Sequence, residues 1–435
     1  MKKFSAEKVV SDPVYGIIDI RPVLPMVETK EFQALGDKRQ LGMAYLTFPS
    51  ATHSRKAHSL GAYHATRELG DRWVKLGMAT RHEADALAAY ALYHDIGHPA
   101  FSHVTEPFCP LPADAPKGMS ANAALSLAVI QRHAREIKAC GIDFALVEAF
   151  ARHKHPLHAA VSDKNFGMEK LDYLERDGLS TILSRPIGIE YLRHHIYFVN
   201  GQLAIDEKVI DNAIEAQNFY VKMYKNVYLR KTPMIAQRMV QKMAHRLIAA
   251  GALDPADLQN LTDSELIGIM RLSKDPVVQM MYALLAQRDL YREAIVVRPA
   301  RFVRSAGKDE KKKAFTLGAG EKEIRRLIRA PALHTRRHAA LAELEDAIAR
   351  VAGIPAGHVL VIPINSPERF EAKDIMVYRG RGKAPASLKA RYPAHFKDLE
   401  EVAEDYLAFR ICTTERWRKK LSDPRVAQRA LKLVI

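Results

Sequence analysis

Two adjacent residues, His94 and Asp95, follow a strongly apolar stretch that runs from Ala84 to Tyr93. That stretch has the spacing of a buried helix, so the imidazole and the carboxylate at its end need partners. An unpaired polar group inside a protein is costly. A divalent metal ion satisfies both groups at once, and it also activates water and polarises phosphoryl oxygens. This pair therefore predicts a hydrolytic metal centre.

A third metal-binding side chain, His58, lies on another predicted helix. Ser54 is a suitable N-cap residue, and the helix that it begins should run to about Leu76. Small residues at positions 61, 62 and 65 share the inner face with His58 and allow close approach of a second helix. A helix–turn–helix hairpin would bring His58 to the pair at 94 and 95. Considered alone, His58 would more simply be a satisfied core histidine.

A further carboxylate is expected from the helix predicted over residues 169–177. One face of this helix carries Glu169, Asp172, Tyr173, Arg176 and Asp177. The face is either solvated, with an ion pair four residues apart, or a carboxylate wall opposite the histidines. Two histidines, one aspartate and a further carboxylate suit one divalent ion, which could be Mn, Fe, Zn, Ni or Mg.

Proton donors and phosphate-binding groups accompany this constellation. His98 and His103 lie on the turn beyond the apolar helix. Imidazole titrates near neutral pH, so either residue could protonate a leaving alkoxide or bind phosphate. Arg55 and Lys170 could hold the phosphates that do not react.

Bulk properties limit the class of protein. The chain has 435 residues, enough for one large or two ordinary domains. The formal net charge of +16 favours polyanionic partners, either nucleotides or nucleic acid, although a solvated basic surface is the alternative. No apolar run is long enough for a membrane span, so no membrane partner is expected. Three dispersed cysteines and an N-terminus without a signal-like apolar core lead us to expect a cytoplasmic protein.

The distribution of helical and strand patterns predicts a mainly α fold with two parts. Helical periodicity dominates residues 1–295, which should form a helical core with an N-terminal arm. Strand patterns at Val359–Pro363 and Asp374–Tyr378 alternate with helices after that. We therefore expect residues 296–435 to form a smaller, mixed α/β C-terminal lobe.

Together these residues resemble the HD-domain phosphohydrolases, so the helical core should be an HD domain. More narrowly, the chain looks like the catalytic core of the sterile-alpha-motif-and-HD-domain dNTP triphosphohydrolases and their bacterial dGTPase relatives. The resemblance covers most of the chain. Besides the residues above, it includes Asp12-Pro13 with Gly16, Gln40-Leu41-Gly42, Phe48-Pro49, Ser59-Leu60-Gly61, Ile96-Gly97 and Phe101-Ser102.

The resemblance implies a metal site and catalytic residues. The implied metal ligands are His58, His94 and Asp95. The family's last ligand is an aspartate, and Glu169 takes its position here, with Asp172 as the alternative. The catalytic residues would then be Asp95 and the two histidines of the following turn, His98 and His103.

The resemblance also implies how a nucleotide would be held. The implied reaction is attack of a metal-activated hydroxide on the α-phosphorus, which releases a nucleoside and inorganic triphosphate. Family members are usually homo-oligomers, so a dimer or tetramer is expected. The implied substrate contacts are Arg55, His98, His103 and Lys170 for phosphate, Gln40 and Leu41 for the sugar, and Tyr173 and Asp177 for the absence of a 2′-hydroxyl.

Departures from the family pattern keep other functions open. Asn122 stands where a histidine is expected, and Asn226 and Met234 stand where a phosphate-binding arginine and a base-stacking tyrosine are expected. One alternative is an HD phosphohydrolase of another phosphoester: a nucleoside monophosphate, a modified nucleotide or single-stranded nucleic acid. The other is a catalytically inactive HD module that binds nucleotides or nucleic acid.

Overall fold

The described residues form two compact units whose segments interleave along the chain. The computed structural model describes residues 8–303, 314–330, 333, 338–364, 373–380, 383–404 and 407–434. The first unit contains Met1–Met223, Ala256–Leu266 and Ala372–Phe396, and the second contains Tyr224–Pro255, Ile267–Glu371 and Lys397–Ile435. The sequence-based boundary after residue 295 falls inside strand β5 (Arg292–Pro299), and the division into 1–295 and 296–435 stays a prediction.

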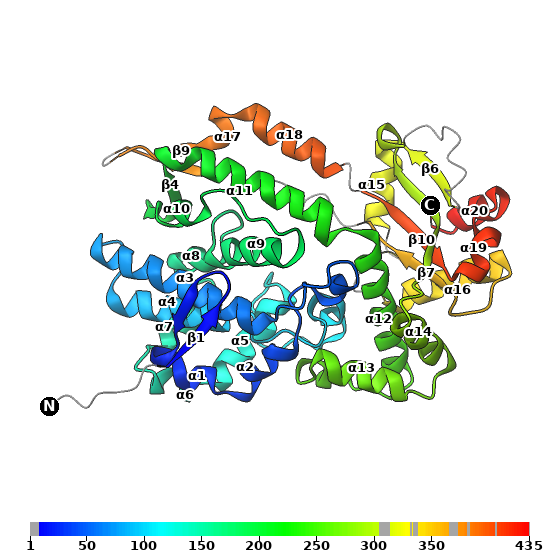
Figure 1. The fold of residues 1–435 in the computed structure, drawn as a ribbon, viewed down its shortest axis with the longest axis horizontal. Coiled ribbons are helices and arrows are strands. Elements are labelled where there is room, and N and C mark those ends of the chain that lie inside the picture. Colours follow the sequence, from blue (N-terminus) through cyan, green and yellow to red (C-terminus); the bar gives the residue numbers. More distant parts are fainter. Residues whose placement is uncertain are drawn as a thin grey trace. The chain divides into compact units, whose positions relative to one another are not determined.

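The first unit is built around a pair of helices, α3 (Arg55–Lys75) and α4 (Arg81–Tyr93), as Figure 1 shows. These two helices pack along each other, helix α9 (Met168–Thr181) packs on α3, and helix α7 (Phe144–Ala151) packs on α4. The remaining α-helices that lie wholly in this unit are α1 (Leu24–Val27), α2 (Lys30–Ala34), α5 (Ala121–Arg132), α6 (Ala134–Ala139), α8 (Ala159–Ser162), α10 (Ile189–Arg193), α11 (Ile210–Met223) and α17 (Leu388–Arg391).

Local sequence signals determine where each helix of this pair begins. The Ser54 side chain accepts the Ala57 N–H and begins α3 where the sequence predicts it. Thr80 begins α4 with a reciprocal capping box to Glu83. Gly61 allows α9 to approach α3, because a Cβ atom there would lie 1.9 Å from the Asp172 carboxylate. The close packing of α9 against α3 therefore requires a glycine at position 61.

Two small sheets complete the first unit. Strands β1 (Val9–Asp12) and β2 (Gly16–Asp19) form an antiparallel hairpin. The second sheet has the order β3-β4-β8-β9, with β4 and β8 parallel. Its strands are β3 (Ile196–Val199), β4 (Gln202–Asp206), β8 (Met376–Tyr378) and β9 (Ala386–Ser387). Strand β8 is thus correctly predicted as a strand, but it pairs with β4 of the helical core.

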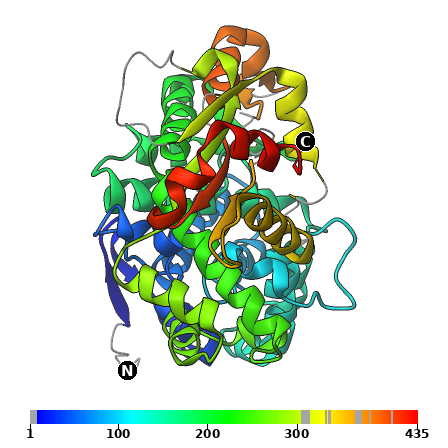
Figure 2. The same ribbon diagram turned by 90° about the vertical axis from the view of Figure 1, so that its right-hand side faces the viewer.

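The second unit combines a four-stranded sheet with helices, in agreement with the mixed α/β prediction for the C-terminal part. The strand order is β6-β5-β10-β7, with β10 (Phe409–Thr413) antiparallel to β5 and to β7 (Val359–Ile362), and β6 (Phe315–Ala319) parallel to β5. Figure 2 shows α19 and α20 beside these strands. The helices are α12 (Lys231–Ala249), α14 (Pro276–Ala286), α15 (Glu321–Arg329), α16 (His338–Ala352), α19 (Glu415–Leu421) and α20 (Pro424–Leu431), with α13 (Asp263–Leu272) and α18 (Pro393–Glu404) spanning the unit boundaries.

The mainly α fold predicted from the sequence is confirmed. Within the described part of the chain, none of the helices combines the length and the apolar character needed to cross a bilayer. The apolar core of the second unit lies between its sheet and the helices α15, α16, α19 and α20.

Candidate metal centre and substrate site

Three buried side chains converge where α3 meets the end of α4. His58 comes from the first turn of α3, His94 is the C-cap of α4, and Asp95 follows it. The two Nε2 atoms of the histidines are 3.2 Å apart. Asp95 Oδ1 is 3.6 Å from His94 Nε2, and Asp95 Oδ2 is 3.9 Å from His58 Nε2. The structure therefore brings together the three ligands expected from the sequence.

Hydrogen bonds on the far side of each ring define which nitrogen faces the cluster. His58 Nδ1 lies 2.7 Å from Asp172 Oδ2, and His94 Nδ1 lies 2.7 Å from the Ala91 carbonyl oxygen. Because both partners are acceptors, each Nδ1 carries the proton and donates it. When both rings are neutral, both Nε2 atoms are unprotonated and present lone pairs to each other. This arrangement, with the outer nitrogen fixed by an acceptor, is typical of metal-binding histidines.

The distances fit a single divalent ion. Two ligand nitrogens at about 2.1 Å from a metal, with an angle between roughly 90° and 110°, are about 3.0 to 3.4 Å apart. The observed separation of 3.2 Å between the two Nε2 atoms lies in this range. Without a cation, two facing lone pairs at this distance repel each other. The residues present therefore fit the metal that the sequence predicts.

A buried chain of charges supports His58 from behind. Arg176 donates Nε to Asp172 Oδ2 at 3.0 Å and Nη2 to Asp172 Oδ1 at 2.9 Å. Its Nη1 donates to Asp12 Oδ2 at 2.8 Å. Burial acts to raise the pKa of Asp172, but Arg176 and His58 hold it well below its usual range. Both oxygens of Asp172 are thus engaged, which favours a supporting role over direct ligation.

Glu169 lies close to this cluster without being part of it. Its side chain is half-buried on the first turn of α9. Burial lowers the pKa of His58, but Asp172, Asp95 and Glu169 raise it overall, so the Glu169 charge acts on His58. The set around His58 whose ligand atoms lie within 4.8 Å of one another consists of His58, His94 and Asp95. The role of Glu169 as a fourth ligand stays a prediction.

Asp95 is surrounded by donors. The Arg55 guanidinium donates to Oδ2 of Asp95, and Asn122 Nδ2 and His98 Nε2 each lie 3.2 Å from Oδ1. Burial acts to raise the pKa of Asp95, but His98, His94 and Arg55 hold it well below its usual range. Arg55 also donates Nε to Ser102 Oγ at 2.5 Å. The Arg55 guanidinium, which is predicted to bind phosphate, is therefore already held beside the cluster by Asp95 and Ser102.

Two further histidines and a glutamate border the cluster. Burial and the nearby Arg55 lower the pKa of His98 to about 3, and its buried Nδ1 has no partner among the described residues. The His103 side chain is 73% exposed, and its Nδ1 lies 2.7 Å from Glu106 Oε2. Glu106 was not predicted from the sequence, although its spacing three residues after His103 could have indicated a contact. These three side chains form a second set of potential metal ligands.

Two of the residues expected to contact the substrate, Tyr173 and Asp177, lie on α9 at increasing distance along the helix from Glu169. Tyr173 has its ring centroid 6.3 Å from that of His58. One turn further, Asp177 Oδ1 is 2.7 Å from His53 Nε2. Gln40, preceding a half-buried Leu41, donates its backbone N–H to the His53 carbonyl at 3.0 Å. All of these residues except His53 are predicted from the sequence.

Lys170 presents its ammonium group to an aromatic ring. Its Nζ lies 3.4 Å from the centroid of the Tyr220 ring and 2.6 Å from the Lys164 carbonyl oxygen. Burial lowers the pKa of Lys170 to about 7. A phosphate contact from Lys170 would have to replace at least one of these interactions.

Comparison with known proteins places this site in a family. The HD domain profile matches residues 55–177, which contain all three members of the His58–His94–Asp95 cluster, and an HD-associated region matches residues 187–328. Residues 55–177 therefore form an HD domain, which an HD-associated region follows. HD domains bind divalent metal ions, and the cluster in this HD domain could hold one. The resemblance read from the sequence is thereby confirmed.

Curated relatives carry the same HD domain within longer chains. A putative HD domain-containing protein of Acanthamoeba polyphaga mimivirus is 28% identical over 268 residues, which cover 55% of this chain and 58% of the viral protein. The deoxynucleoside triphosphate triphosphohydrolase SAMHD1 homolog of Dictyostelium discoideum is 25% identical over 309 residues, 66% of this chain and 60% of that protein. The chain thus spans about three fifths of the length of these relatives.

A solved structure has the same fold as this HD-domain protein. The crystal structure of a phosphohydrolase from Bacteroides thetaiotaomicron superposes with a TM-score of 0.70 at 21% sequence identity. The match covers 94% of this chain and all of the other. At this identity the likeness establishes the fold.

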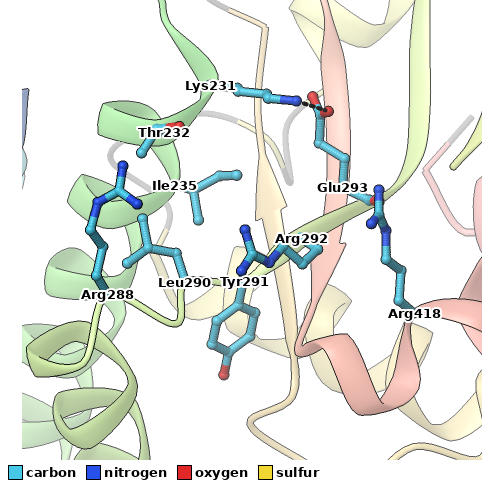
Figure 3. Close-up of a pocket in the computed structure, with 9 residues that line it drawn as sticks. All are labelled: Lys231, Thr232, Ile235, Arg288, Leu290, Tyr291, Arg292, Glu293 and Arg418. Carbon is cyan, nitrogen blue, oxygen red and sulfur yellow. Dashed lines mark hydrogen bonds and ion pairs between the residues drawn. The ribbon is translucent and has the colours of Figure 1, made fainter. Parts of the chain in front are cut away.

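The second unit contains a separate, basic pocket of about 220 Å³ between the start of α12 and strand β5, drawn in Figure 3. Lys231 forms an ion pair with Glu293 at 3.4 Å, and Arg418 donates Nε to the Glu293 carbonyl at 2.9 Å. Arg288 and Arg292 also line the pocket. Its cationic lining suits an anion, and no member of the metal cluster contributes to it.

Proposed function

We propose that this chain is a metal-dependent hydrolase of deoxynucleoside triphosphates that releases a nucleoside and inorganic triphosphate. The observation that carries the proposal is the convergence of His58 and His94, whose Nε2 atoms meet beside Asp95 at a separation suited to one divalent ion. The substrate class is supported by a relative named a deoxynucleoside triphosphate triphosphohydrolase homolog. The net charge of +16 also favours an anionic substrate.

The protein groups around the metal position have defined tasks in this reaction. A bound divalent ion supplies Lewis acidity, which lowers the pKa of a water molecule and polarises a phosphoryl oxygen. Asp172 holds the His58 ring, and Arg55 holds the Asp95 carboxylate, so the ligand set is fixed before the substrate arrives. Glu169 is proposed as the remaining protein ligand.

His98 is proposed to bind the reacting phosphate. Its Nε2 lies at hydrogen-bond distance from Asp95, and its buried Nδ1 has no partner among the described residues. An anionic phosphate beside a histidine raises the pKa of the ring, because it stabilises the charged form. Nδ1 then gains a proton and donates it to the phosphate oxygen. The protonation of His98 would thus be coupled to substrate entry.

His103 and Glu106 are proposed to move the proton. Burial acts to raise the pKa of Glu106, but the His103 hydrogen bond and charge lower it to about 2, so the carboxylate is ionised at neutral pH. Glu106 accepts the Nδ1–H of His103 and stabilises the imidazolium form of the ring, whose Nε2–H would give its proton to the departing 5′-oxygen. The proton that the attacking water loses would then restore the imidazolium. Water thus adds its hydroxyl to the triphosphate and a proton to the nucleoside.

The remaining predicted residues complete a proposed nucleotide site. Arg55 and Lys170 would neutralise phosphate oxygens, and Gln40, Leu41, Tyr173 and Asp177 would surround the sugar. A homo-oligomer and a nucleic-acid partner remain predictions from the sequence.

A product assay tests the proposed function. Purified protein loaded with Mn, Fe, Zn, Ni or Mg should release inorganic triphosphate from at least one of the four dNTPs. His94→Ala and Asp95→Ala should each abolish this release, whereas replacement of the exposed His82 by Ala should leave it unchanged. Orthophosphate from monophosphates or shortened oligonucleotides would instead identify another phosphoesterase. Tight nucleotide binding without any product would identify an inactive binding module.

A further inference from the structure

His53 has no role among those proposed above, yet it lies next to Asp177. Its side chain is 10% exposed, and its Nε2 lies 2.7 Å from Asp177 Oδ1. Since a carboxylate accepts hydrogen bonds, Nε2 carries the ring proton and Nδ1 presents a lone pair. That Nδ1 is buried and has no partner among the described residues.

Gln40 offers a second buried polar atom of this kind. An isolated antiparallel bridge pairs Arg39 with Ser54, so Gln40 lies opposite His53, and its N–H donates to the His53 carbonyl at 3.0 Å. Side chains of directly opposed residues point to the same face of such a pair. The Gln40 Oε1 atom is buried and also lacks a partner among the described residues. Buried polar atoms are normally paired, so two such atoms together indicate a ligand.

The position of these atoms relative to the metal cluster is set by α9. Glu169, Tyr173 and Asp177 are spaced four residues apart, so they lie in one row along the helix. The Tyr173 ring is beside His58, and Asp177 is one further turn, about 6 Å, along the axis. A sugar linked to a phosphate at the cluster would therefore extend toward His53 and Asp177.

We infer that His53 is a specificity-determining residue of this site, whose Nδ1 accepts a hydrogen bond from the 3′-hydroxyl of the nucleotide sugar while its Nε2 holds Asp177. The inference rests on the proposed function for the identity of the ligand. It adds a neutral acceptor to the sugar contacts implied by the family resemblance, and it assigns the two ring nitrogens different tasks.

Two substitutions separate these tasks. In His53→Gln, the side-chain amide reaches the place of Nε2, so the contact to Asp177 is retained and the acceptor at Nδ1 is lost. In His53→Asn, the shorter amide occupies the place of Nδ1, so the acceptor is retained and the contact to Asp177 is lost. His82→Gln on the exposed face of α4 is the matched control.

Binding of the four dNTPs and of the matching 2′,3′-dideoxynucleoside triphosphates is measured by calorimetry, and triphosphate release is measured in parallel. The unmodified protein should bind at least one dNTP about tenfold more tightly than its dideoxy counterpart, the usual value of one hydrogen bond. His53→Gln should reduce this ratio to about one, and His53→Asn should retain a preference. The control should keep the full ratio.

The outcomes distinguish this inference from the proposed function. Equal binding of both sugars by the unmodified protein, or a ratio lost in His53→Asn but kept in His53→Gln, overturns the role of Nδ1 even if triphosphate is released. A hydroxyl-dependent ratio that disappears in His53→Gln supports the inference even if no triphosphate is released, in which case only the hydrolytic function fails. Absence of binding by any of these nucleotides overturns both.

Discussion

Each of the two units contains a buried cluster of charged groups, and the two clusters differ in how completely they are paired. In the second unit, Glu345 is fully buried and accepts from Arg238 at 2.9 Å, from Lys242 at 2.7 Å and from the Val361 N–H at 2.8 Å. The two cations also donate to backbone carbonyl oxygens of strand β7. Each of these three side chains therefore has its partners within the protein.

In the cluster of the first unit, by contrast, several buried polar atoms lack hydrogen-bond partners among the described residues. The Nε2 atoms of His58 and His94 face each other at 3.2 Å, and His98 Nδ1 and Asn122 Oδ1 are buried without partners among the described residues. A complete cluster of buried charge serves stability or specificity of the fold. An incomplete one leaves unpaired polar groups for a ligand or a bound water molecule to satisfy. Both clusters are charged and buried, so neither property distinguishes them. The completeness of their hydrogen bonding does, and it identifies one as a structural ion cluster and the other as a candidate active site.

The largest expected effect tests the complete cluster. Glu345→Gln removes the carboxylate between two buried cations, so the free energy of unfolding measured with urea should fall by about 3 to 5 kcal/mol. Replacing all three members by apolar residues (Arg238→Met, Lys242→Met and Glu345→Leu) should restore most of it. His94→Ala in metal-free protein should cost much less than Glu345→Gln. An equal loss would mean that the His58–His94–Asp95 cluster is also a structural cluster.

A smaller effect is expected from the chain of charges behind the metal ligand. Asp12→Asn keeps one acceptor oxygen but places an amide donor against the Arg176 guanidinium, which should loosen Asp172 and through it the His58 ring. Outer partners of metal-binding histidines are worth roughly 10- to 100-fold in affinity, and Asp12 is two steps further out, so about tenfold is expected. Competition with a chelating dye measures the metal affinity.

Asp71→Asn provides the control for that experiment, because Asp71 pairs with Arg81 on the exposed side of α3. Its metal affinity should equal that of the unmodified protein. Unchanged affinity in both variants would show that the contact between Asp12 and Arg176 serves the β1–β2 hairpin alone.

The smallest effect is expected at the solvent edge of the incomplete cluster. The pKa of Glu106 is lowered to about 2 in the folded protein, mainly by His103 against the effect of burial, whereas an unfolded glutamate titrates near its ordinary value of about 4.3. The unfolded state therefore binds the proton first as pH falls, and the stability from Glu106 is lost between about pH 4.3 and pH 2. The exposed His103 limits this contribution to about 1 kcal/mol.

Glu106→Gln tests this sign. Urea unfolding at pH values from 6 to 3 should show the unmodified protein losing its advantage over the variant as the pH falls. A constant difference between the two proteins over this range would mean that Glu106 does not titrate in that window. The same variant should also reduce triphosphate release at neutral pH if Glu106 orients His103.

The sequence determined the local features of this HD domain. Ser54 and the small residues on the inner face of α3 fixed that helix and the inward direction of His58, and the apolar run before His94 fixed α4. These features depend on neighbouring residues, through side-chain capping and the 3.6-residue period, so they can be read from short stretches. The spacing of Glu169, Tyr173 and Asp177 on α9 belongs to the same class.

Only the tertiary structure decided which distant residues share a cluster. Asp12 meets Arg176 across 164 positions and His53 meets Asp177 across 124, while β8 leaves the C-terminal region to pair with β4. No periodicity or capping signal records such pairs, because they result from how whole helices pack and from the backbone approach that a residue such as Gly61 allows. The sequence therefore determines which residue types make up the site. The fold determines which of their polar atoms have hydrogen-bond partners within the protein.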